Sequence, residues 1–375
     1  MRSIDKFHGC LIGGAAGDAL GYSVEFLSYD DIISHYKMDG ITEYNLHGDV
    51  AEISDDTQMT LFTANGLLLG KTRLMTRGFM GSYQSYIAYC YKDWYKTQTE
   101  AFRECEEDDY CYSWLMNLPE MFCKRAPGNT CLSAISSGEN GSVDEPINDS
   151  KGCGGIMRVA PIGLYFIDST IPQNDIDMLG AETAALTHGH ELGYIPAAML
   201  VHIVSLLADG KTDVKGAVLG AMKAMYMLFQ NSKHIGELQV LIDKAVALSE
   251  SDISDINAIS QLGEGWVAEE TLAIAVYCAL KYPDDFEKAI IASVNHNGDS
   301  DSTGAVTGNI LGAYLGYDKI PKKFSEKLEL KDVILELADD LYKDCKMEKY
   351  SSYRDEIWTK KYIDNTYDMN KIMED

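Results

Sequence analysis

The feature that most constrains the fold is a stripe of glycines near the C-terminal end of the chain. Glycine occurs at every fourth position in the series Gly304, Gly308, Gly312 and Gly316. Residues four apart share one face of an α-helix, and a face without side chains lets a second backbone approach closely. Each glycine inside a helix costs roughly 1 kcal/mol relative to alanine, so a run of them indicates a geometric need. The stripe therefore predicts a helix that packs tightly against another helix.

Elsewhere the apolar residues also recur mainly at helical spacing. One such series is Val218, Met222, Met225 and Phe229. Residues 197–207 form a nearly continuous apolar stretch that ends before Gly210, which is typical of a buried helix. Only two short segments, residues 41–46 and 161–167, are candidates for strands. We therefore predict an all-α fold, a compact multi-helix domain in which those two segments are the only candidates for short strands.

No domain boundary is evident in the sequence. Proline is sparse, with 8 in 375 residues, and no Gly/Ser linker or low-complexity segment divides the chain. A hydrophobic content of 46% is sufficient for one large core. From about Lys346 the sequence becomes polar and rich in tyrosine. We therefore predict one domain over residues 1–345, followed by a C-terminal extension over residues 346–375 to which we assign no role.

Composition and charge exclude several classes of protein. The formal net charge of −26 would repel a nucleic acid backbone, and no basic stripe with interleaved aromatic residues occurs. The 9 cysteines contain no C-x-x-C pair, so we expect reduced thiols rather than disulfides or a zinc ribbon. The sequence has neither a run of about 18 apolar residues nor a signal peptide. We therefore expect a soluble, cytoplasmic monomer that binds neither nucleic acid nor membranes.

Two short acidic segments, residues 54–57 (SDDT) and 298–304 (GDSDSTG), each precede a stretch with helical character. Carboxylate and hydroxyl oxygens are the ligands that hard divalent cations prefer, so the two segments predict one divided site for a close pair of Mg²⁺ ions. Each segment on its own is equally typical of a helix cap. An EF-hand calcium loop is excluded, because Ile310 occupies the position that requires a bidentate Glu.

Two further segments carry candidate functional residues. Glu25 lies between apolar neighbours just after a small-residue stretch at residues 9–21, where a carboxylate needs a partner or a metal. Residues 148–158 contain the most suitable phosphate cradle in the chain, since glycines let successive N–H groups point at an anion and Lys151 and Arg158 can supply charge. As an isolated motif such a loop is more often a tight turn.

Other motifs exclude more than they predict. The glycine-rich segments match neither the dinucleotide-binding fingerprint nor the spacing of a nucleotide P-loop. His188 and His190 supply two histidines with no third ligand nearby in sequence, so a zinc site is not indicated. His188 is either a hydrogen-bonding residue at a substrate pocket or an ordinary histidine.

Together these motifs resemble those of the ADP-ribosylglycohydrolase family. The resemblance rests on residues 17–21 (GDALG) with Glu25, 54–57 (SDDT), 125–131 (RAPGNTC), 152–158 (GCGGIMR), 187–190 (THGH) and 295–305 (NHNGDSDSTGA), which follow the family's order. It covers residues 1 to about 345 and implies an all-α fold with a binuclear metal site that holds two Mg²⁺ ions, or Mn²⁺ in some members. It also implies a hydrolase that acts on ADP-ribosylated proteins or related conjugates and binds ADP-ribose.

The resemblance implies roles for individual residues. The implied metal-site residues are Ser54, Asp55, Asp56, Asp299, Asp301 and Ser302. The implied catalytic residues are Glu25, Asp55, Asp56 and Asp301. The implied ADP-ribose-binding residues are Gly152, Cys153, Gly154, Gly155, Met157 and His188. Ser54 departs from the threonine that is commoner in the family but keeps the ligand oxygen.

Among the bonds that the family cleaves, we expect the N-glycosidic bond to arginine, because residues 17–26 and 299–302 most resemble the arginine-directed branch. The acidic run at residues 104–109 is a candidate to receive the guanidinium group, although a solvated loop is the commoner meaning of such a run. The alternatives are hydrolysis of ADP-ribosyl-serine or O-acetyl-ADP-ribose, cleavage of the pyrophosphate by a two-metal phosphohydrolase, and ADP-ribose binding without catalysis.

Overall fold

Helices form all the regular secondary structure in residues 2–103 and 111–369, the part of the chain that the computed structural model describes. The α-helices are α1 (Ile4–Tyr22), α2 (Tyr29–Tyr36), α3 (Asp55–Arg77), α4 (Tyr83–Thr99), α5 (Asn129–Ser136), α6 (Ala160–Tyr165), α7 (Gln173–Ala185), α8 (Glu191–Asp209), α9 (Val214–Leu228), α10 (Ile235–Ser249), α11 (Asp255–Ile259), α12 (Ala268–Lys281), α13 (Phe286–Val294), α14 (Ser300–Leu315), α15 (Lys331–Lys343) and α16 (Glu356–Tyr362). Short 3-10 helices are η1 (Trp114–Asn117), η2 (Pro119–Met121), η3 (Cys153–Gly155), η4 (Tyr317–Lys319) and η5 (Lys322–Phe324). The predicted all-α fold is confirmed.

Neither of the two candidate segments forms a strand. Residues 41–46 run as irregular chain, and residues 161–165 lie in α6, where Pro161 occupies the first turn. Proline is tolerated there because the first N–H groups of a helix have no partner within the helix. Every residue of α6 is buried, and a short apolar run reads alike in a buried helix and a buried strand. Both strand candidates are therefore excluded.

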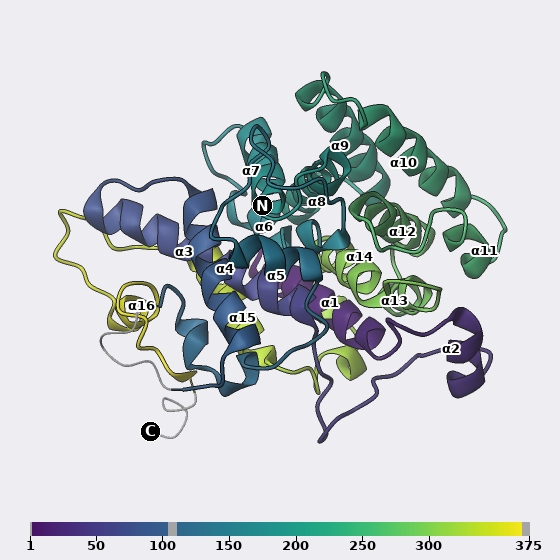
Figure 1. Ribbon diagram of the computed structural model, residues 1–375, viewed down its shortest axis with the longest axis horizontal. Helices are drawn as coiled ribbons and strands as arrows, with labels where there is room; N and C mark the ends of the chain where they lie inside the picture. Colours follow the sequence, from purple (N-terminus) through teal and green to yellow (C-terminus); the bar gives the residue numbers. More distant parts are fainter. Residues whose placement is uncertain (1, 104–110, 370–375) are drawn as a thin grey trace.

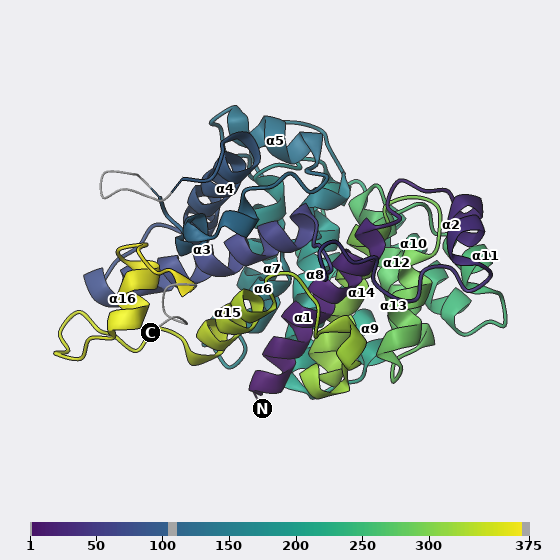
Figure 2. The ribbon, with the colours of Figure 1, turned by 90° about the horizontal axis from the view of Figure 1, so that it is seen from below.

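The helices α1 and α14 lie side by side through the middle of the molecule (Figures 1 and 2). They meet backbone to backbone. A Cβ atom added at Gly308 would lie 1.9 Å from the Gly13 carbonyl oxygen, and one added at Gly13 would lie 2.4 Å from the Gly308 oxygen. Asn309 donates a hydrogen bond from Nδ2 to the Cys10 oxygen at 2.9 Å. The predicted tight helix pair is confirmed, and a second row of glycines on α1 completes it.

Further helices lie on two sides of this pair. The helices α9 to α13 lie on one side, and α3, α4, α15 and α16 lie on the other (Figure 1). In the described residues one helix, α8, is long and apolar enough to cross a membrane by length and composition, and 83% of its apolar window is buried inside the protein. Such burial is typical of a core helix. The helix ends at Gly210, which has a left-handed φ of 75°.

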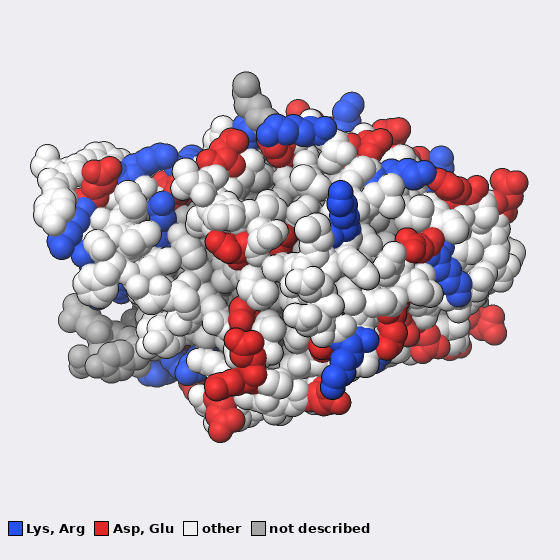
Figure 3. All heavy atoms as spheres, turned by 90° about the horizontal axis from the view of Figure 1, so that it is seen from above, with Lys and Arg blue, Asp and Glu red and all other residues white. Residues whose placement is uncertain are grey.

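The face shown in Figure 3 carries charged side chains of both signs, separated by uncharged residues. No continuous basic stripe crosses the described part of this face. On this side the described residues therefore offer no extended basic surface to an anionic polymer.

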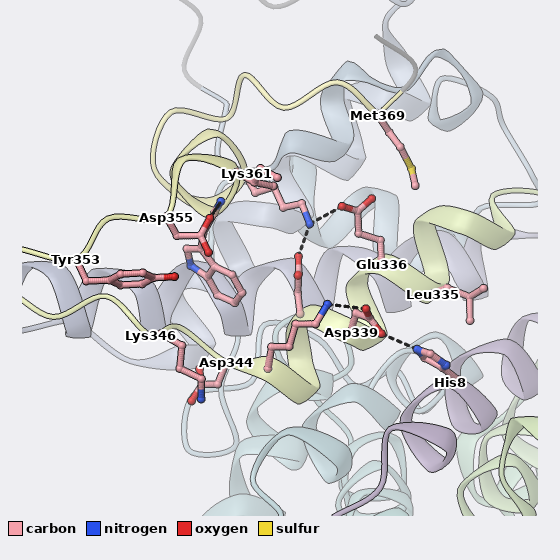
Figure 4. Close-up of a pocket in the computed structure, with 14 residues that line it drawn as sticks. His8, Leu335, Glu336, Asp339, Asp344, Lys346, Tyr353, Asp355, Lys361 and Met369 are labelled. Carbon is pink, nitrogen blue, oxygen red and sulfur yellow. Dashed lines mark hydrogen bonds and ion pairs between the residues drawn. The ribbon is translucent and has the colours of Figure 1, made fainter. Parts of the chain in front are cut away.

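The C-terminal segment that contains α16 packs against α3, α15 and η1. Lys361 of α16 is 3% exposed, and its Nζ atom lies 2.6 Å from both Glu336 Oε1 and Asp340 Oδ2 (Figure 4). Trp358 donates a hydrogen bond from Nε1 to Thr72 Oγ1 on α3 at 2.8 Å. A buried ammonium group is costly unless it is paired, so these contacts fix α16 in one place. The described part of the extension belongs to the folded body.

We expect Gly308→Ala to lower the free energy of unfolding by about 3 kcal/mol or more, because the added methyl group meets backbone that cannot move aside. Gly236→Ala is the matched control, since Gly236 also lies in a helix, α10, but a Cβ there meets nothing within 4 Å. The control should be unchanged or stabilised by up to about 1 kcal/mol. Urea denaturation followed by circular dichroism compares the two, and equal stability would contradict the close packing of α1 and α14.

Candidate active site

The two acidic segments come together because each lies at the N-terminus of a core helix. Ser54 caps α3, and its Oγ atom accepts a hydrogen bond from Asp56 N at 3.2 Å. Asp299 caps α14, and its Oδ1 atom accepts a hydrogen bond from Ser302 N at 3.1 Å. Both helix starts open into one cavity of about 460 Å³. The capping interpretation is therefore confirmed, and residues of the same two segments also line one cavity.

Most of the predicted site residues line this cavity. Those that do so are Glu25, Asp55, Asp56, Gly152, Cys153, Gly154, Met157, His188, Asp299, Asp301 and Ser302. The other two predicted site residues, Ser54 and Gly155, do not line the cavity. Ser54 is fully buried next to Asp56. Gly155 serves helix packing, because a Cβ there would lie 3.0 Å from both Ala184 Cβ and the Gly193 oxygen.

The carboxylates of the wall are almost wholly buried, with Asp55 at 4%, Asp56, Asp299 and Asp301 at 3%, and Glu25 at 7% exposure. Burial, followed by the charge of neighbouring carboxylates, raises the pKa of Glu25 to about 9. Burial likewise raises the pKa values of Asp55, Asp56 and Asp301 well above their usual range. In the described residues no Lys or Arg side chain lines the cavity. If these carboxylates are ionised, no basic side chain in the described cavity wall therefore offsets their negative charge.

Two buried oxygen atoms of this wall, Glu25 Oε2 and Asp56 Oδ2, have no hydrogen-bond partner. A buried carboxylate oxygen without a partner carries a desolvation cost that a bound cation would offset. The donor set of carboxylates and hydroxyls fits a hard ion such as Mg²⁺ or Mn²⁺. Within the described ranges, however, no three His, Cys, Asp or Glu side chains form a group that would chelate an ion as they stand. Metal binding therefore stays a prediction.

Asp18 is a further buried carboxylate that we did not single out as a site residue. It lies on α1 and is 0% exposed, and its side chain accepts hydrogen bonds from Ser54 N at 3.0 Å and Thr57 N at 3.1 Å. Burial raises its pKa to about 6, although these hydrogen bonds act in the opposite direction. Asp18 thus anchors the start of α3, which carries the first acidic segment. Its signal in the sequence is a charged residue alone within the small-residue stretch 9–21.

The glycine loop adjoins the acidic wall, since Cys153 donates a hydrogen bond from Sγ to Asp299 Oδ2 at 2.8 Å. A Cβ at Gly154 would lie 2.8 Å from Cys131 Sγ, so a larger residue would displace the neighbouring wall. The Cys153 N–H group is engaged with the Trp266 carbonyl oxygen at 3.2 Å. The loop therefore presents backbone and a thiol to the cavity, rather than basic side chains.

The prediction that Lys151 and Arg158 supply charge to a bound phosphate is wrong, since neither side chain lines the cavity. Lys151 Nζ is paired with Glu269. Arg158 is fully buried, donates from Nη2 to Thr187 Oγ1 at 2.7 Å, and lies 4.5 Å from the centroid of the Tyr91 ring. The Arg158 guanidinium therefore contacts the Tyr91 ring and the Thr187 hydroxyl, and not the anionic ligand that we expected.

His188 lies in the cavity wall and is held as a neutral ring. Burial, followed by the charge of Arg158, lowers its pKa to about 3. Thr187 Oγ1 accepts a hydrogen bond from Arg158 and lies 2.8 Å from His188 Nδ1. A neutral imidazole has one N–H donor and one acceptor nitrogen. The Nε2 atom lies on the side of Gly152, whose added Cβ would be 3.2 Å from it.

Two exposed aromatic residues at the cavity, Phe26 and Trp266, were also not singled out as site residues. They are 73% and 40% exposed, and both line the cavity. Their one signal in the sequence is that Phe26 directly follows Glu25. The acidic run at residues 104–109, which we expected to receive a guanidinium, lies outside the described residues.

The fold and the cavity define an all-helical protein with a buried, carboxylate-rich site beside a glycine loop. Residues 1–350 match the model of a family described as ADP-ribosylglycohydrolase. The chain therefore belongs to the ADP-ribosylglycohydrolase family, which is a family of enzymes, and the resemblance drawn from the motifs is confirmed.

Relatives of known name cover nearly the whole chain. ADP-ribosylhydrolase ARH3 of Mus musculus is 25% identical, over 88% of each chain. ADP-ribosylarginine hydrolase Tri1 of Serratia proteamaculans is 26% identical, over 91% of this chain and 80% of its own. ADP-ribosyl-[dinitrogen reductase] glycohydrolase of Rhodospirillum rubrum is 25% identical, over 87% of this chain and 91% of its own. A solved ADP-ribosylglycohydrolase-related protein complex matches with a TM-score of 0.53 and 22% identity, over 91% of this chain and 98% of that chain, which shows the shared fold.

The neutral His188 makes stability depend on pH. In the unfolded chain a histidine takes up a proton below about pH 6.5, whereas the folded protein resists protonation down to about pH 3. The free energy of unfolding of the wild type should therefore fall, relative to that of His188→Gln, by up to about 1.4 kcal/mol per pH unit below pH 6.5. Urea denaturation of both proteins at several pH values measures this difference. A difference that is constant with pH would mean that His188 titrates as an ordinary surface histidine.

Proposed function

We propose that the protein hydrolyses the glycosidic bond between ADP-ribose and a modified arginine side chain and releases ADP-ribose. The observation that carries the proposal is the single cavity in which Glu25, the acidic starts of α3 and α14, and the glycine loop face one another. Membership of the family supports the glycohydrolase activity. The similarity to a relative named as an ADP-ribosylarginine hydrolase supports the arginine acceptor.

We also propose that two Mg²⁺ ions, or Mn²⁺ in their place, bind in this cavity. The residues that would hold them are Ser54, Asp55, Asp56, Asp299, Asp301 and Ser302. The support is the partnerless oxygen atom of Asp56 and the lack of any Lys or Arg side chain in the described cavity wall. When bound, such ions supply fixed positive charge that holds sugar hydroxyls and makes a water molecule more acidic.

Side chains of the protein carry out the other steps of the reaction. Positive charge develops on the ribose as its bond to the guanidine nitrogen breaks, and the carboxylates of Asp55 and Asp301 stabilise that charge. A guanidine is too basic to leave as an anion, so the cationic guanidinium of the substrate leaves as a neutral guanidine. The water molecule that bonds to the ribose loses a proton, and Glu25 passes that proton to the guanidine through its partnerless Oε2 atom. The N–H group of the neutral His188 ring positions an oxygen atom of the ADP-ribose.

Product analysis on arginine-modified and serine-modified proteins tests the proposal. We expect free ADP-ribose from the arginine substrate at a rate about tenfold or more above that from the serine substrate, because only a guanidinium is held by carboxylates before cleavage. EDTA should abolish turnover and Mg²⁺ should restore it.

Each other outcome has one meaning. AMP as the product would assign a phosphohydrolase, and affinity for ADP-ribose without turnover would assign a binding protein. Equal rates on the two substrates would remove the arginine assignment. Full activity in protein that elemental analysis shows to be free of metal would remove the metal site.

Asp301→Asn should lower the rate about 100-fold or more, which corresponds to roughly 2.7 kcal/mol of transition-state stabilisation, while leaving the fold intact. The substitution removes an anionic oxygen but keeps the shape of the side chain. Asp213→Asn is the matched control, because Asp213 caps α9 outside the cavity and Asn caps a helix as well as Asp. The control should react at the wild-type rate. A near-normal rate for Asp301→Asn at saturating Mg²⁺ would show that Asp301 only supports the helix start.

A further inference from the structure

Phe26 and Trp266 form an exposed aromatic pair at the edge of the cavity. They are 73% and 40% exposed, although large aromatic side chains gain much from burial. Their ring centroids lie 6.1 Å apart, with the ring planes 23° from parallel. Both residues line the same cavity as Glu25. The folded chain thus leaves a flat apolar surface open beside its buried carboxylates.

Both aromatic residues belong to the acidic end of the cavity. Phe26 directly follows Glu25 in the turn after α1. The Trp266 carbonyl oxygen accepts a hydrogen bond from Cys153 N at 3.2 Å, and Cys153 Sγ in turn donates to Asp299 Oδ2. The pair is therefore attached to two of the segments that surround the proposed reacting bond.

Flat π surfaces beside carboxylates are complementary to one kind of acceptor side chain. A guanidinium is a planar cation that stacks on aromatic faces and also pairs with carboxylates. A serine side chain offers neither a plane nor a charge. No Lys or Arg side chain lines the described cavity wall, so no basic side chain there would repel a cation that the substrate brings.

We propose that Phe26 and Trp266 form the acceptor subsite, on which the guanidinium of an ADP-ribosylated arginine stacks while Glu25 supplies the neighbouring carboxyl group. This inference rests on the proposed glycohydrolase activity and gives the arginine preference a structural source. It assigns the two rings to recognition of the acceptor and not to the ADP-ribose. The affinity for free ADP-ribose should therefore be independent of them.

Variants that remove one flat face at a time test the subsite. Phe26→Leu and Trp266→Leu keep apolar bulk, whereas Trp266→Phe keeps an aromatic face. Each leucine variant should lose about tenfold in kcat/KM on an arginine-modified peptide, with little change on a serine-modified peptide or in the Kd of ADP-ribose. Trp266→Phe should retain most of the arginine activity. Phe79→Leu, at a phenylalanine that is 70% exposed and outside the cavity, is the matched control and should behave as the wild type.

A binding measurement gives a readout that does not depend on turnover. Calorimetry in the Asp301→Asn background compares the arginine-modified peptide with free ADP-ribose. Trp266 is the most exposed of the 4 tryptophans, at 40%, so its fluorescence should also report the stacked guanidinium. The modified peptide should bind more tightly than ADP-ribose, and Trp266→Leu should abolish both that excess and the fluorescence change.

The possible failures are distinct from one another. Equal losses on both peptides together with weaker ADP-ribose binding would assign the rings to adenine and overturn the subsite. An unchanged preference in both leucine variants would overturn it as well. Failure of the proposed function would appear instead in the wild type, as no release of ADP-ribose from arginine-modified peptide. In that event the calorimetric comparison still decides whether the rings bind a guanidinium.

Discussion

The contact on which the rest of the structure depends is the backbone packing of α1 against α14. A Cβ at Gly21 would lie 2.2 Å from the Ser300 oxygen, so the end of α1 touches the start of α14. This contact brings the turn that carries Glu25 close to Asp301, and both residues line the same cavity. The same helix supplies Asp18, which holds the start of α3. One glycine-lined seam thus assembles three parts of the cavity wall that are far apart in sequence.

Folding buries the carboxyl groups of the cavity close together, which is unfavourable for their ionised forms. Burial raises the pKa values of Glu25, Asp55, Asp56 and Asp301, so the folded state favours their protonated forms. The stability that these groups contribute is therefore present in acid and is lost as the pH rises above their unfolded pKa values of about 4. A ligand that binds the ionised carboxylates would restore that stability by mass action. Carboxylates gathered at this cost in stability are expected at a functional site.

Features that depend on residues close together in the sequence could be predicted. Contacts between segments that are far apart in the sequence could not. The glycine stripe and the two acidic segments act through helix geometry, which a period of four and a capping residue reveal. Residues 161–167 were misassigned because a short apolar run does not distinguish a strand from a buried helix. Arg158 was misassigned because Tyr91, on which it lies, comes from α4, which is far from Arg158 in the sequence. Phe26 and Trp266 were missed because nothing in the sequence shows that large aromatic residues stay exposed.

The position of α16 affects the order in which the protein can complete its fold. The helix α3 carries the first acidic segment at its start and is covered further along by α16, where Trp358 bonds to Thr72. A ribosome adds residues in order, so α1 is without α14, and α3 without α16, until nearly all of the described chain has emerged. A chain that stops short of α16 would leave apolar surface open on α3, where chaperones and proteases act. The emergence of α16 thereby becomes a condition for covering this part of α3.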